Sequence, residues 1–90
     1  MPRTIRIAAA QVGAVHRDDD RSTTINRLIR LLHEAADEGA QVVLFPECTF
    51  TTFFPRYLLT DKTELESFFE HSDVTTAKDT KGIFDAAYSA

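Results

Sequence analysis

The sequence has few of the residues that cross-link or bend a chain. Its 90 residues include one cysteine, three glycines and three prolines. One cysteine cannot form an internal disulfide, which argues against a disulfide-rich secreted miniprotein and favours a reducing compartment. The few glycines and prolines exclude collagen-like and proline-rich linker sequences. No stretch approaches the roughly 18 apolar residues that span a bilayer, so we expect no membrane partner.

Basic residues are also in the minority, with 10 Lys and Arg against 14 Asp and Glu and a net charge of −4. This balance argues against a surface for nucleic acid. The acidic excess lies in residues 61–90, where we expect solvated helical surface. Arg3 and Arg6 precede an apolar stretch, but Gln11 and Gly13 interrupt it and no small-residue cleavage site follows. We therefore expect a cytoplasmic protein without a signal peptide.

The overall composition, with 43% hydrophobic and 27% charged residues, is that of a globular domain. Residues 3–12 combine β-branched residues with small alanines, which predicts an inner strand. A helix is predicted between Asp20 and Gly39, with acidic residues at its N-terminus and glycine as its left-handed stop. Its apolar face comprises Ile25, Leu28, Ile29, Leu32, Ala35 and Ala36, and its opposite face Arg27, Arg30, Glu34 and Asp37.

Residues 41–45 contain the uninterrupted apolar run Val-Val-Leu-Phe, which is typical of a parallel strand buried on both faces. Strand, helix and strand predict a right-handed βαβ unit and an α/β fold. The segment 48–59 is expected to be a loop with short helical turns. Two further helices are expected, over 61–69 with a capping box of Thr63 and Glu66, and over 81–90.

Two strands buried on both faces need further strands and helices, which 90 residues hardly supply. We therefore expect residues 1–90 to be one N-terminal piece of a larger domain.

Glu47 is the candidate residue for chemistry. It follows the second strand behind Pro46, and functional groups of open α/β sheets gather at the carboxyl ends of strands. A carboxylate partly withdrawn from water there would accept a proton more readily, which suits a general base that works near neutral pH. A solvated loop residue is the plainer interpretation, which spacing alone favours.

Short motifs on both strands and in the loop identify a resemblance. The first set resembles the opening of the nitrilase superfamily of carbon–nitrogen hydrolases; it comprises Ile5, Ala10 and Gln11, then Gly39-Ala40, then Phe45-Pro46-Glu47. The second set is similar to N-carbamoyl-D-amino-acid amidohydrolases; it comprises Thr51-Thr52-Phe53-Phe54-Pro55-Arg56, Thr60-Asp61, Glu64-Leu65 and Ser67-Phe68. The resemblance covers residues 5–70, with a weaker match from Lys81.

The resemblance implies that the chain is the N-terminal part of a nitrilase-type α-β-β-α sandwich with a Glu-Lys-Cys triad. Glu47 matches the general base, whereas the triad lysine and cysteine lie downstream, so we expect the 90-residue chain alone to be inactive. The implied reaction converts an N-carbamoyl-D-amino acid, the small-molecule partner, to the D-amino acid, carbon dioxide and ammonia. The complete enzyme is implied to be a homo-oligomer without metal or cofactor, and His16, His33 and His71 are not at ligand spacing.

Several neighbours of Glu47 have two interpretations. Cys48 is expected to be a small buried apolar residue, because adjacent side chains of an extended segment diverge and the similar enzymes carry an aliphatic residue there. Arg56 fits a substrate carboxylate or a surface salt bridge. The aromatic residues of the loop fit a substrate pocket or a core; they are Phe50, Phe53, Phe54 and Tyr57.

One segment departs from the pattern of the similar enzymes, and other functions compete with this prediction. Residues 72–80 lack the Pro/Gly turn of the similar enzymes, which makes the last stretch a weaker match. A nucleotide-binding unit is disfavoured because residues 11–15 contain no glycine-rich phosphate loop. A non-catalytic interaction or regulatory module remains an alternative, as does another amidase or nitrilase branch.

Overall fold

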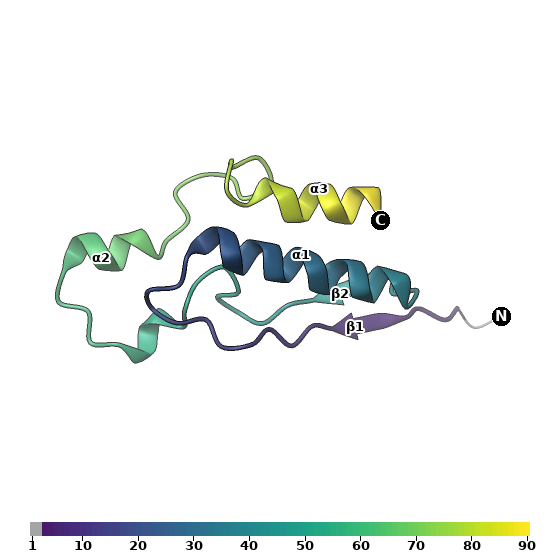
Figure 1. Ribbon diagram of the computed structural model, residues 1–90, viewed down its shortest axis with the longest axis horizontal. Coiled ribbons are helices and arrows are strands. Elements are labelled where there is room, and N and C mark those ends of the chain that lie inside the picture. The colour runs from purple at the N-terminus through teal and green to yellow at the C-terminus, as the bar shows by residue number, and fades with distance from the viewer. Residues whose placement is uncertain (1–2) are drawn as a thin grey trace.

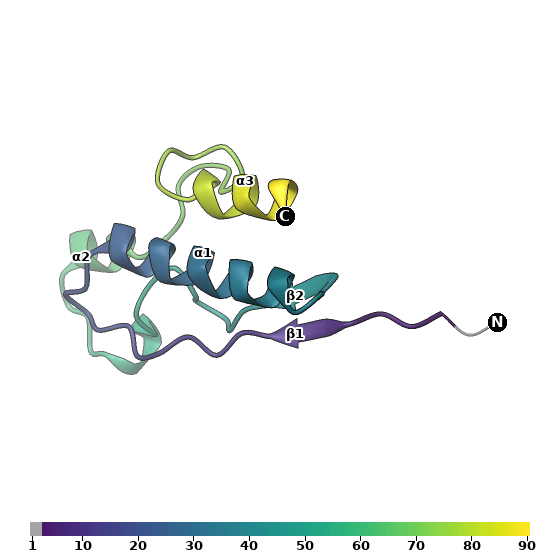
Figure 2. The same ribbon diagram turned by 45° about the vertical axis from the view of Figure 1, so that its right-hand side comes forward.

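The computed structural model describes residues 3–90, apart from the side chain of Arg56. Its elements are β1 (Ile7–Ala9), α1 (Arg21–Asp37), β2 (Val42–Leu44), a 3-10 helix (Phe54–Arg56), α2 (Lys62–Ser67) and α3 (Lys81–Ser89). α1 lies between the sheet and α3, while α2 lies near the N-terminal end of α1 (Figures 1 and 2). No helix within residues 3–90 has the length and apolarity to cross a membrane.

The central helix α1 forms as its periodicity predicts. Leu28 is fully buried, and Ile25 and Leu32 flank it on the same face. Asp20 is the N-cap, although its carboxylate accepts from the Ser22 hydroxyl at 3.1 Å instead of from a backbone amide. Gly39 adopts φ 82° and donates its amide to the Ala36 carbonyl at 2.9 Å. The predicted left-handed stop is therefore confirmed.

The two strands pair in parallel, in the register Ile7↔Val42 and Ala9↔Leu44. Each is three residues long, shorter than the predicted 3–12 and 41–45, because each strand has a single neighbour in the described chain. The prediction that the second strand is buried on both faces is wrong. Val43 packs toward the core, but Val42 and Leu44 are 49% and 65% exposed on the other face.

The C-terminal third contains the two expected helices. The predicted capping box at Thr63 is wrong, because α2 begins two residues earlier than such a cap requires: Asp61 is its N-cap and accepts the Thr63 amide at 2.9 Å. α3 packs on α1 through Ile83, which is 6% exposed. The core consequently lies between α1 and α3, with half-buried Val43 and Phe45 beside it.

The molecule is extended for its length. Its radius of gyration is 15.0 Å, against about 12 Å for a compact domain of this size. Within residues 3–90, the buried hydrophobic side chains are Ile25, Leu28, Leu32 and Ile83. Helices on one face of a two-stranded parallel sheet are consistent with part of an α/β domain, and no second sheet is present in the described residues.

Candidate active site

The carboxyl ends of the two strands meet at one edge of the sheet. The Ala10 amide donates to the Leu44 carbonyl at 2.8 Å, which extends the pairing just beyond β1. The chain segments that follow then enclose a shallow pocket of about 180 Å³. It is lined by residues 12–15 after β1 and residues 46–49 after β2, with Thr51 and Phe53 completing the lining. This is the location that parallel-sheet topology predicts for a functional site.

Glu47 lines this pocket directly after β2, as predicted. Its side chain is exposed, however, so the partly desolvated position expected for a general base is not formed in this chain. Pro46 and Glu47 lie past the end of the strand pairing, where the uncovered sheet provides no side chains to exclude water. Glu47 therefore has the location expected of a general base, but its carboxylate is in contact with solvent.

Cys48 is exposed, and the prediction of a buried residue is wrong. Its backbone has φ 53°, the left-handed region that non-glycine residues seldom adopt. The segment is consequently turned at Cys48, and the extended geometry that we expected to separate the two side chains is absent. Cys48 and Glu47 line the same pocket, although no hydrogen bond joins them among the described residues.

The loop aromatics divide between the two roles considered for them. Phe53 is 46% exposed and lines the Glu47 pocket. Phe50 packs against the core, and Phe54 stacks on Phe68 with ring centroids 5.5 Å apart. Tyr57 lies beneath the guanidinium of Arg17 at 5.3 Å. Phe53 is thus the member of this group that the structure brings to the pocket, while the side chain of Arg56 lies outside the described residues.

Arg27 is a residue that sequence reasoning assigned to the solvent face of its helix. It is half-buried instead, and its Nη1 donates to the carbonyls of Gly13 and Ala14 at 3.3 Å and 3.1 Å. Those two residues form part of the pocket lining. Helical periodicity gave no signal for this contact, because it depends on the course of the loop between β1 and α1.

The described residues contain no group of three His, Cys, Asp or Glu side chains that could hold a metal ion. His71 contacts the Glu66 carbonyl through Nε2 at 2.9 Å, and the backbone amide of His16 donates to the Asp19 carboxylate at 2.8 Å. These histidines take part in local surface contacts and are not gathered at the pocket.

Comparison with known families gives a match to the carbon-nitrogen hydrolase model over residues 6–87. The chain belongs to the carbon-nitrogen hydrolase family. The match runs through residues 72–80, where the expected Pro/Gly turn is missing, and into α3. This places the chain in the nitrilase superfamily, as its strand and Phe-Pro-Glu motifs predicted.

Among curated relatives of the chain, the omega-amidase NIT2-A of Xenopus laevis is 46% identical over 41 residues. That alignment covers 41% of this chain and 15% of the length of the relative. The comparisons support the superfamily, and the finer resemblance to N-carbamoyl-D-amino-acid amidohydrolases has no support from them.

Proposed function

We propose that residues 1–90 are the N-terminal portion of an enzyme that hydrolyses a non-peptide carbon–nitrogen bond, with Glu47 as its general base. The observation that carries the proposal is the position of Glu47 in the pocket where the two parallel strands end. Membership of the carbon-nitrogen hydrolase family supports the reaction class. The complete enzyme supplies a lysine and a nucleophilic cysteine from beyond these residues, is cytoplasmic and forms a homo-oligomer.

The proposed substrate is an N-carbamoyl-D-amino acid. Glu47 takes the proton of the catalytic thiol, and the thiolate attacks the carbamoyl carbon. Glu47 returns that proton to the departing amino group, so the D-amino acid leaves and a carbamoyl-cysteine remains. Water activated by Glu47 then attacks the carbamoyl carbon and releases the thiol and carbamate, which breaks down to carbon dioxide and ammonia. The support for this substrate is the run Thr51–Arg56, of which Thr51 and Phe53 line the pocket.

A simple amide is the second candidate substrate, favoured by the similarity to an omega-amidase. Turnover of ureido, amide and nitrile compounds by the complete enzyme separates these branches. Faster cleavage of an amide or a nitrile would replace the carbamoyl assignment. Absence of turnover with all three classes would favour the non-catalytic module.

The role of Glu47 is tested by Glu47→Gln in the complete enzyme. This substitution keeps the size of the side chain and removes its basicity, so kcat should fall by about 10²–10⁴-fold or more. Glu34→Gln is the matched control, because Glu34 is an exposed glutamate of α1 outside the pocket lining. Near-normal turnover of Glu47→Gln would show that another group is the base.

A further inference from the structure

The pocket wall formed by residues 12–15 is part of a long connection. Residues 10–20 join β1 to α1, whereas connections of this kind usually have about two to six residues. Gly13 and Ala14 are both exposed, and Val12 and Val15 are only half-buried. Val12 packs against the core, so apolar contact holds the start of this segment, whereas exposed Gly13 and Ala14 depend on polar contacts.

Two sets of polar contacts hold the connection. At its far end, the Asp19 carboxylate and amide close a turn on His16, and Arg17 pairs with Glu64 of α2 on the surface. At the pocket end, Arg27 donates from one guanidinium nitrogen to both the Gly13 and the Ala14 carbonyl. Hydrogen bonds from a charged donor are stronger than neutral ones, and Arg27 reaches two successive carbonyls of the connection at once.

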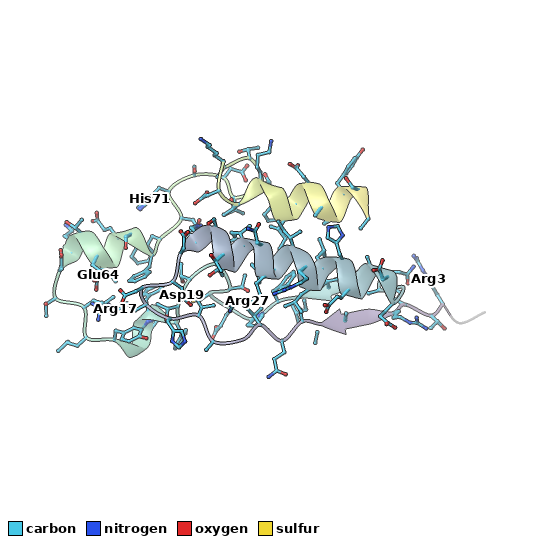
Figure 3. All side chains as sticks on the ribbon, viewed as in Figure 1. Arg3, Arg17, Asp19, Arg27, Glu64 and His71 are labelled. Atoms are coloured by element: carbon cyan, nitrogen blue, oxygen red, sulfur yellow. The ribbon has the colours of Figure 1, made fainter. Side chains whose placement is uncertain are left out.

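We propose that Arg27 is a positioning residue of the candidate site, which holds residues 12–15 in place as a wall of the pocket that Glu47 also lines. The proposal rests on the proposed function of that pocket. Arg27 contacts the backbone of the wall and is not itself part of the pocket lining. Figure 3 shows Arg27 on α1, away from the labelled pair Arg17 and Glu64, which lies at the far end of the connection.

The test compares three variants in the complete enzyme. Arg27→Met keeps the length and the apolar stem of the side chain and removes every donor. Arg27→Lys retains the charge and a donor, and guards against a variant that fails to fold. Arg30→Met is the matched control, because Arg30 is an exposed arginine one turn further along α1, with no hydrogen bond or ion pair recorded within residues 3–90.

The first measurement is the NMR order parameter of the Gly13 and Ala14 amides. We expect it to fall from about 0.85 to below about 0.6 in Arg27→Met. It should stay unchanged in Arg30→Met and be partly retained in Arg27→Lys. Unchanged order in a folded Arg27→Met would overturn the proposal, whatever the activity of the enzyme.

The second measurement is kcat and KM. A misplaced wall persists after substrate binds, so kcat should fall by about 10- to 100-fold in Arg27→Met and recover in part in Arg27→Lys. A fall in Tm with unchanged kcat would mean that Arg27 has a structural role only. If wild-type enzyme cleaves no carbon–nitrogen substrate, the proposed function fails, and the order parameters still decide whether Arg27 holds the wall.

Discussion

Leu44→Ala tests whether the uncovered face of the sheet is buried in the complete enzyme. Leu44 is 65% exposed here, so about a third of its surface is buried. Full burial of a leucine contributes about 1.5–3 kcal/mol, so a third corresponds to about 0.5–1 kcal/mol. If a second sheet covers this face, as an α-β-β-α sandwich requires, the truncation should instead cost about 2–5 kcal/mol.

We expect the larger value, measured as the change in the free energy of unfolding of the complete enzyme by chemical denaturation. Leu28→Ala is the control for full burial, because Leu28 of α1 is 0% exposed and belongs to the core cluster that α1 forms with Ile83 of α3. It should cost about 3–5 kcal/mol. A cost below about 1 kcal/mol for Leu44→Ala, beside the full cost for Leu28→Ala, would refute the covered sheet and with it the sandwich.

Three further predictions concern this chain. The exposed Cys48 thiol should react fully with a thiol reagent under native conditions, and Cys48→Ala should leave kcat of the complete enzyme within a few-fold; loss of activity in folded protein would make Cys48 catalytic. The Thr75 hydroxyl and amide lower the pKa of Asp73 below its ordinary 3.8. The stabilisation that this provides is present above pH 3.8 and is lost as the pH falls through the lower pKa of the folded state. In the complete enzyme, Asp73→Asn should therefore flatten the fall of Tm below about pH 4, and an unchanged pH profile of Tm would contradict this. Residues 1–90 alone should show no turnover and no cooperative unfolding, and a sharp monomeric transition would favour the interaction module.

The sequence predicted best those features that depend on local interactions. The apolar spacing of α1, the glycine that ends it and the parallel βαβ order are set by residues close in the chain, and all three are present. The strands were predicted too long, because the length of a strand depends on how many strands pair with it, and sequence periodicity carries no information about that number. The N-cap of α2 was displaced by two residues for a local reason, since Asp61 satisfies the Thr63 amide directly.

The details of the pocket could not be predicted in the same way. The positive φ of Cys48 has no signal in its residue type, because glycine and asparagine are the usual occupants of that region. The contact of Arg27 with the wall depends on the path of residues 10–20, which no periodicity describes. The location of Glu47 could be predicted because it requires only that parallel strands end at the same edge of the sheet. This location agrees with the structure.

The proposed role of Glu47 links its exposure to that of the sheet. Leu44 precedes Glu47 by three residues; Leu44 is exposed on the uncovered face of the sheet, and Glu47 is exposed just past the end of β2. A layer that buries Leu44 would also restrict water at the neighbouring carboxyl edge, which is the environment a general base requires. If Glu47 has the role that we propose, stability and catalysis are thereby linked at this edge: the layer that gives Leu44→Ala its full energetic cost would also withdraw the Glu47 carboxylate from water.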